Sequence, residues 1–132
     1  DTDKVNAERR ARASLPRNVI HVSTLEDYRN VVGNEKEKIV AVRFYATYCK
    51  ACQAVAPLFY KLANENPNVI FVDVPVTAKN AALHQGLGVP SLPFGHIYDP
   101  EGGLVEEMKL TRQQISDFGK KLGDFTKRSC DI

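Results

Sequence analysis

The sequence predicts an α/β domain in which a central mixed β-sheet is flanked by helices on both faces. Apolar segments rich in β-branched and aromatic residues alternate with segments of helical periodicity, in the order β-α-β-α-β-α-β-β-α. Alternating strands and helices are typical of a parallel sheet. The last two strands are joined by a short turn, so they should add an antiparallel pair.

The first three elements are a strand over residues 18–22, a helix and a second strand over residues 39–45. Ser23 and Glu26 fit the pattern of a capping box, in which the side chain of each residue accepts a hydrogen bond from the backbone N–H of the other. The helix that they open should end at Gly33. The run IVAVRFY at 39–45 is almost continuously apolar, which predicts a strand buried on both faces.

The later elements follow from the same two periodicities and from turn residues. A helix over 54–65 has apolar residues on one face and should be kinked by Pro57, which lacks an N–H. Glycine and proline separate the remaining segments. The expected elements are a strand at 69–74, a helix at 78–87, strands at 94–98 and 104–110 joined by the turn 99–103, and a helix from 111 to about 122.

Length and composition are those of one globular domain that needs no cross-links. The chain has 132 residues, of which 43% are hydrophobic and 26% charged. Its formal net charge is +2, which gives no case for nucleic acid, and no apolar stretch is long enough to cross a membrane. We expect a monomer with a flexible N-terminal arm over 1–17, a folded domain over 18–125 and a C-terminal tail over 126–132.

The pattern Cys49-Lys50-Ala51-Cys52 carries the chemistry, and three interpretations are open. A metal site needs four ligands, and neither Cys130 nor any of the three histidines has the spacing to complete one. A structural disulfide is possible, although such a short loop removes little unfolded-state entropy. A C-x-x-C pair after a strand of a βαβ pattern favours a redox site.

The predicted position of Cys49 supports the redox interpretation. It falls where a strand meets a helix, and free N–H groups at a helix start favour an anion. The thiolate is the reactive form of cysteine, and Lys50 adds positive charge beside it. Cys52 lies one turn later, so it can attack a mixed disulfide formed by Cys49.

The sequence resembles the thioredoxin family over residues 18–123. The resemblance rests on four short motifs with matching spacing. They are Phe44-Tyr-Ala46, Cys49-x-x-Cys52, Ala56-Pro57 and Leu92-Pro93. The stretches Leu92-Pro-Phe-Gly-His-Ile-Tyr98 and Asn64-Glu-Asn-Pro67 also resemble atypical plastid thioredoxins of plants and algae.

This resemblance implies a thioredoxin-like fold and protein thiol–disulfide exchange, with Cys49 as nucleophile and Cys52 as resolving residue. It implies that Pro93 is a cis proline facing the disulfide. It also implies no cofactor, clients that contain disulfides, an upstream thiol reductase, and a place in the plastid stroma or otherwise the cytoplasm. The residues expected to contact a client are Tyr48, Lys50, Ala51, Leu92 and Pro93.

The sequence also departs from the family pattern. Tyr48 stands in place of the usual Trp, Lys50-Ala51 in place of Gly-Pro, and Met108-Lys109 where a glycine usually flanks the client groove. The family's buried Asp is replaced by Arg43, which cannot act as a base. We expect Arg43 to pair with Asp73 on the neighbouring strand and to tune the site, or else to extend its charge to the surface.

Two other functions stay open at this stage. The same chemistry can run in reverse, as a protein oxidant or isomerase. Alternatively, the fold can act as a binding module whose cysteines are incidental. We expect His96 to be a strand residue with a satisfied partner, His84 to lie on a helix surface, and Cys130 to be a free thiol.

Overall fold

The structure is a computed structural model that describes residues 15–130, with the backbone alone for 128–130. Most of the expected arm and the end of the expected tail therefore lie outside the described residues, and the domain limits stay a prediction. The elements in chain order are β1 (Val19–His21), α2 (Leu25–Tyr28), the π-helical turn η1 (Arg29–Gly33), β2 (Val40–Tyr45), α3 (Lys50–Glu65), β3 (Ile70–Pro75), α4 (Ala81–Gly86), β4 (Phe94–Asp99), β5 (Gly103–Lys109) and α5 (Ile115–Cys130).

The strands form one five-stranded mixed sheet in the order β1-β3-β2-β4-β5. β1, β3 and β2 run parallel, and β4 and β5 run antiparallel to their neighbours. The parallel core and the antiparallel hairpin are both confirmed. β2 and β3 lie at the centre, which explains why their sequences are almost continuously apolar.

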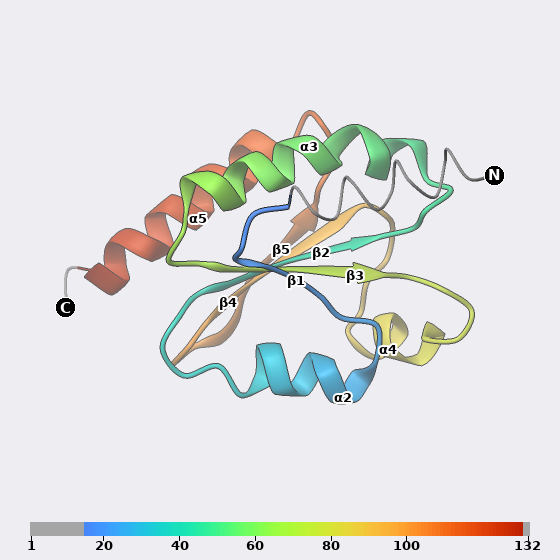
Figure 1. The fold of residues 1–132 in the computed structure, drawn as a ribbon, viewed down its shortest axis with the longest axis horizontal. Coiled ribbons are helices and arrows are strands. Elements are labelled where there is room, and N and C mark those ends of the chain that lie inside the picture. The colour runs from blue at the N-terminus through green and yellow to red at the C-terminus, as the bar shows by residue number, and fades with distance from the viewer. Residues whose placement is uncertain (1–14, 131–132) are drawn as a thin grey trace.

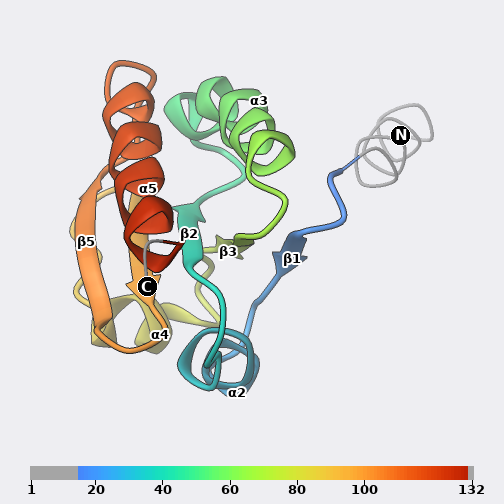
Figure 2. The same cartoon turned by 90° about the vertical axis from the view of Figure 1, so that its left-hand side faces the viewer.

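Helices cover both faces of this sheet, as the sequence predicts. Figure 1 shows α3 and α5 on one face and α2 and α4 on the other, and the turned view in Figure 2 agrees. Each face has its own apolar core, because side chains of a strand alternate between the two faces. Val55, Phe59, Phe71 and Phe118 belong to the core beneath α3 and α5, and Phe44 belongs to the other.

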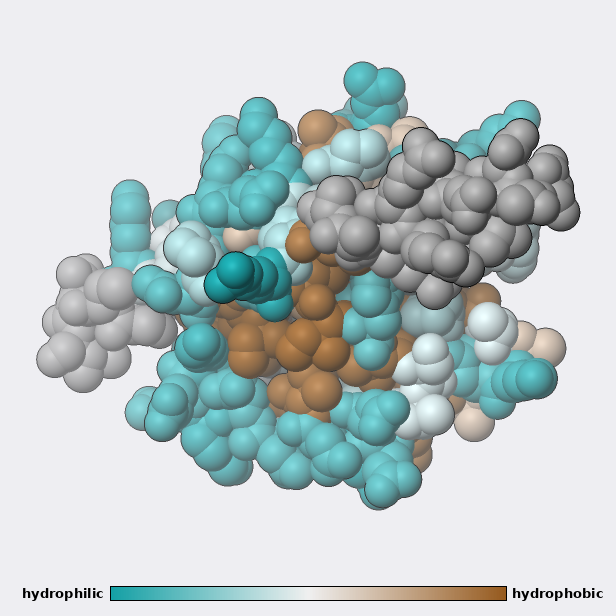
Figure 3. Space-filling view, in the orientation of Figure 1, coloured by the Kyte–Doolittle hydropathy of each residue, from teal (hydrophilic) through white to brown (hydrophobic). Residues whose placement is uncertain are grey.

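The surface around β1 is partly apolar. This strand has three residues and pairs on one side with β3, so it forms an edge of the sheet. Figure 3 shows apolar surface in this region, where the side chain of Ile20 is 38% exposed. A short edge strand limits the backbone available for pairing with other chains.

Several expected helix boundaries need correction. The cap of α2 is Thr24, whose hydroxyl accepts from the N–H of Asp27 at 3.1 Å, rather than a box of Ser23 and Glu26. Both patterns satisfy a free N–H, and they differ by one residue. α3 begins at Lys50 and continues through Pro57 to Glu65, and α5 runs on to Cys130 instead of ending near Leu122.

Candidate redox site

The cysteine pair lies where β2 gives way to α3. Cys49 is the N-cap residue of α3, with φ −84° and ψ 114°, and its sulfur accepts the N–H of Cys52 at 3.2 Å. The two sulfurs lie at disulfide distance, with Cα atoms 5.2 Å apart. Cys49 is half-buried, whereas the side chain of Cys52 is 1% exposed. The expected strand-to-helix position of Cys49 is therefore confirmed.

This position favours a thiolate at Cys49 over one at Cys52. The N-cap side chain is the acceptor for a free N–H of the first turn, and the positive end of the helix dipole lies beside it. A partly exposed cysteine at a helix N-terminus is the type of cysteine that reacts as a thiolate. Lys50 is exposed next to it and adds positive charge.

Leu92 and Pro93 lie at the same end of the sheet as the cysteine pair. The peptide bond between them is cis, as the resemblance implies. Pro93 immediately precedes β4, whose first residue Phe94 pairs with Phe44 near the end of β2. The carbonyl of Pro93 accepts the N–H of Leu110 at 3.0 Å, so the segment is fixed to the end of β5.

The other residues expected to contact a client are exposed around Cys49. Tyr48 has a side chain that is 82% exposed, and Ala51 is exposed on the first turn of α3. An apolar side chain this exposed is available for contact with another molecule. Their contact with a client stays a prediction.

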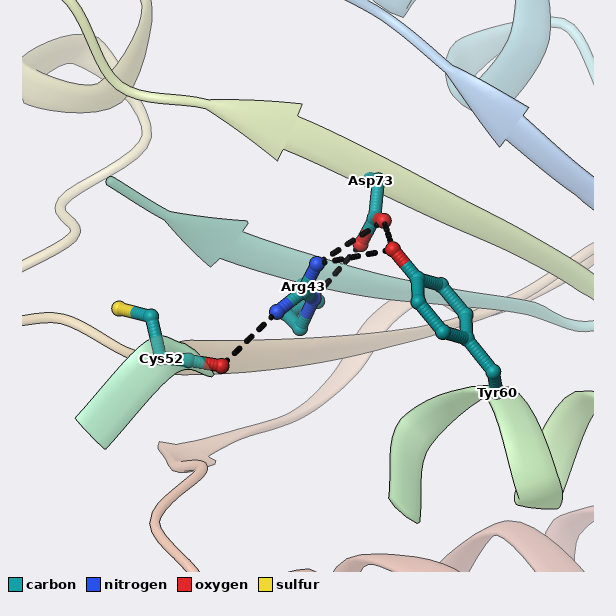
Figure 4. A network of polar contacts seen from close by, with 4 residues as sticks. All are labelled: Arg43, Cys52, Tyr60 and Asp73. Atoms are coloured by element: carbon teal, nitrogen blue, oxygen red, sulfur yellow. Dashed lines mark hydrogen bonds and ion pairs between the residues drawn. The ribbon is translucent and has the colours of Figure 1, made fainter. Parts of the chain in front are cut away.

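Arg43 and Asp73 form the expected pair, and the surface-directed alternative is wrong. They are opposite residues of β2 and β3, with side chains 3% and 0% exposed. Arg43 donates from Nε to Oδ1 at 2.7 Å and from Nη2 to Oδ2 at 3.0 Å, which makes the pair bidentate. Figure 4 shows these contacts between β2 and β3, next to the segment of α3 that carries Cys52.

Two further groups complete this network, and neither was expected from the sequence. Arg43 Nη1 donates to the carbonyl oxygen of Cys52 at 3.2 Å. The Tyr60 hydroxyl accepts from Arg43 Nη2 at 3.1 Å and donates to Asp73 Oδ2. Helical spacing could have indicated Tyr60, because it follows Cys52 by about two turns and so lies on the same side of α3.

Burial and charge fix the protonation of this network. Burial alone would lower the pKa of Arg43, but the hydrogen bonds and charge of Asp73 outweigh burial and raise it. Burial, followed by the Asp73 charge, raises the pKa of Tyr60 well above its ordinary value. The guanidinium also lies 4.3 Å from the centre of the Tyr45 ring. Arg43 is therefore a cation and Tyr60 a hydroxyl donor at neutral pH.

His96 lies on the opposite face of the sheet in a second polar cluster. Its Nδ1 lies 3.2 Å from the Tyr98 hydroxyl, which in turn lies 2.7 Å from the Tyr28 hydroxyl. We expected His96 to have its hydrogen bonds satisfied, and this holds for Nδ1 alone. Within residues 15–130 the Nε2 atom has no hydrogen bond, and it lies 3.9 Å from Glu107 Oε2. Burial lowers the pKa of His96 to about 4. His84 is half-buried on α4 rather than lying on its surface.

Residues 15–130 hold no group of three or more histidine, cysteine or carboxylate side chains that could bind a metal ion. None of the helices in this range is both long enough and apolar enough to span a membrane.

The fold and the site together define a class of protein. A mixed sheet with helices on both faces carries a C-x-x-C pair at a helix start and a cis proline at the same end of the sheet. The thioredoxin family model matches residues 19–120. The chain belongs to the thioredoxin family, and its pair at disulfide distance supports thiol–disulfide oxidoreductase activity.

Curated relatives and solved structures agree with this assignment. The chain is 29% identical over 98 residues to the chloroplastic thioredoxin-like 2-2 of Arabidopsis thaliana, which covers 74% of this chain and 41% of that protein. It is 37% identical over 81 residues to the H-type thioredoxin of Chlamydomonas reinhardtii, and this match covers 61% of this chain and 71% of that protein. The structure of thioredoxin f from spinach chloroplast superposes on this chain with a TM-score of 0.73 at 23% identity. The superposition covers 82% of this chain and 86% of thioredoxin f. The chain spans about two fifths to half the length of the first chloroplastic relatives.

Proposed function

We propose that the protein reduces disulfide bonds in client proteins through Cys49 and Cys52. The Cys49 thiolate attacks one sulfur of a client disulfide lying against Leu92 and Pro93. That bond breaks, a Cys49–client disulfide forms, and the first client sulfur leaves as a thiolate that takes up a proton.

The Cys52 thiol then gives up its proton and attacks the Cys49 sulfur. The second client thiolate leaves and is protonated, and the Cys49–Cys52 disulfide remains. In total the client gains two electrons from the cysteine pair and two protons, of which one balances the proton lost by Cys52 and the other comes from water, because Cys49 enters as a thiolate. An upstream thiol reductase must return the two electrons before the next cycle.

The observation that carries this proposal is the unequal environment of the two sulfurs. Cys49 is half-buried at the N-cap of α3, where a client can reach it and where a thiolate is favoured. Cys52 is buried one turn further on, at disulfide distance from Cys49. A client therefore meets Cys49, while Cys52 is restricted to the internal step.

The comparisons support two further proposals, a location in the plastid and reduction by an upstream thiol reductase. The first curated relatives are chloroplastic thioredoxin-like proteins. One solved structure that superposes on this chain, with a TM-score of 0.70, is of ferredoxin:thioredoxin reductase in complex with thioredoxin f2. We infer that this chain works in the plastid stroma and receives its electrons from a reductase of that kind.

Turnover separates the proposed reductase from a non-catalytic binding module. Reduction of a disulfide-linked protein is followed by turbidity with dithiothreitol as electron source. We expect catalysis by the wild type and by Cys130→Ser, and a rate no higher than dithiothreitol alone for Cys49→Ser. Equal rates with and without the wild-type protein would reject the reductase in favour of a binding module. Oxidation of a reduced client by the Cys49–Cys52 disulfide, followed as the loss of client thiols without dithiothreitol, tests the oxidant alternative.

A further inference from the structure

The first turn of α3 is connected to the sheet by a hydrogen bond from the side chain of Arg43, in addition to the loop that joins β2 to α3. The carbonyl oxygen of Cys52 accepts a hydrogen bond from Arg43 Nη1 at 3.2 Å, and both groups are buried. Arg43 belongs to β2, at the centre of the sheet. The backbone of Cys52 is therefore in direct contact with a buried side chain of the central strand β2.

The direction of this contact is fixed by the other nitrogens of Arg43. Nε and Nη2 both donate to Asp73, and Nη2 also donates to the Tyr60 hydroxyl. A guanidinium is planar, so fixing two of its nitrogens determines where the third one points. Nη1 is thus held towards the Cys52 carbonyl.

Tyr60 closes the network from the helix side. Its hydroxyl accepts from Arg43 and donates to Asp73, and Tyr60 lies on the same helix as Cys52. Helix α3 is therefore held at two points by one ion pair, through the Cys52 carbonyl and through the Tyr60 hydroxyl. Figure 4 shows the sulfur of Cys52 on the side away from its carbonyl oxygen and from Arg43, so the network acts through the backbone.

We propose that Tyr60 and Arg43 are positioning residues for the resolving step: they hold the Cys52 turn so that its sulfur stays within reach of Cys49. This inference rests on the proposed function. The internal attack of Cys52 on the mixed disulfide is a reaction between two groups on one chain, so its rate depends on how well they are held together. The attack of Cys49 on a client does not use the Cys52 sulfur, and it depends on the Cys52 turn through the N–H of Cys52, which donates to the Cys49 sulfur.

Loosening the network should therefore separate the two steps of the reaction. Tyr60→Phe removes the hydroxyl that contacts both Arg43 and Asp73, while it keeps the ring and the ion pair. The internal step should slow and the Cys49–Cys52 disulfide should become less favoured at equilibrium, since both depend on the same effective concentration. The first attack should change less, because it does not use the Cys52 sulfur.

Tyr98→Phe is the matched control for this variant. Tyr98 also has a half-buried hydroxyl with two partners, Tyr28 and His96, and it lies in the core on the opposite face of the sheet. The two variants thus lose the same atom and a similar number of contacts. Only Tyr60 is connected to the turn that carries Cys52.

The test follows the reaction of the reduced protein with excess 5,5′-dithiobis(2-nitrobenzoate) in a stopped-flow instrument, with Cys130→Ser as the parent. Attack by Cys49 releases one coloured thiolate at a rate proportional to reagent concentration. Attack by Cys52 then releases a second one at a rate independent of concentration. For Tyr60→Phe we expect a second phase about threefold to tenfold slower, the scale of one hydrogen bond, and a first phase within about twofold of the parent. Titration with glutathione should show a loss of disulfide stability by a similar factor.

Three results would overturn the inference. The second phase of Tyr60→Phe could match that of Tyr98→Phe. Both phases could slow together, which would indicate general damage to the site. A parent protein that lacks the second phase altogether would reject the proposed function itself, and this inference with it.

Discussion

Removing the charge of Asp73 should destabilise the fold more than any surface charge substitution. Asp73→Asn keeps the size of the side chain but leaves Arg43 without its counter-ion. The side chain of Arg43 is 3% exposed and cannot lose its proton, so it becomes an unpaired buried cation. Breaking a buried pair by removing one partner typically costs about 3–5 kcal/mol.

The structure places the expected value at the lower end of this range. The amide oxygen of asparagine can still accept one hydrogen bond from Arg43, and the Cys52 carbonyl and the Tyr60 hydroxyl still contact the other nitrogens. We therefore expect the free energy of unfolding to fall by about 3 kcal/mol, measured by urea denaturation of the oxidised protein.

Two controls distinguish the charge from other effects. Glu65→Gln disrupts the pair with Lys61, whose atoms are 4.0 Å apart on the surface, and should change stability by less than about 0.5 kcal/mol. The double variant Arg43→Met/Asp73→Leu removes both charges and should be more stable than Asp73→Asn. A loss below about 1 kcal/mol for Asp73→Asn, or a double variant less stable than the single one, would refute the reasoning.

Three further predictions follow from the same structure. Lys50→Gln should lower the reduction potential by roughly 5–20 mV in glutathione buffers, because it removes a positive charge that stabilises the Cys49 thiolate and thus the reduced form; an unchanged or higher potential would contradict this. Burial lowers the pKa of His96 in the folded protein to about 4, whereas its ordinary value is about 6.5. Between these two pH values the unfolded chain binds a proton at His96 and the folded protein does not. The free energy of unfolding should therefore fall by about 3 kcal/mol as the pH drops from about 6.5 to 4. His96→Phe should remove that part of the pH dependence of urea unfolding, and an unaltered slope would exclude His96 as its source. Cys130→Ser should leave turnover within about twofold, because Figure 1 places the end of α5 far from the start of α3, and a tenfold loss would place Cys130 in the mechanism.

The arrangement of strands and helices could be predicted because it depends on patterns along the chain. The apolar runs of β2 and β3 indicate burial on both faces, and the short turn between β4 and β5 indicates a hairpin. Helix ends were less predictable. Ser23 and Thr24 are both good cap residues, and only the backbone geometry decides that Thr24 is the cap.

The site could be predicted in part, for a similar reason. The positions of Cys49, Cys52 and the cis proline follow from local motifs and from resemblance to a family. The Arg43–Asp73 pair required the alignment of two strands, and comparison with the family pattern supplied it. Tyr60 and the Cys52 carbonyl join this pair through contacts between a helix and a strand, and no pattern along the sequence indicates a backbone carbonyl as a hydrogen-bond partner.

The central claim is that Cys49 attacks and Cys52 resolves, and trapping of the mixed disulfide tests it most directly. Cys52→Ser/Cys130→Ser leaves Cys49 as the one thiol, and Cys49→Ser/Cys130→Ser leaves Cys52. Each variant is mixed with a disulfide-bonded peptide, and the adduct is located by mass spectrometry of proteolytic fragments. Because Cys49 is accessible at the helix start and the side chain of Cys52 is 1% exposed, we expect a persistent adduct on Cys49 and little or none on Cys52. An adduct that forms faster on Cys52 than on Cys49 would contradict the account.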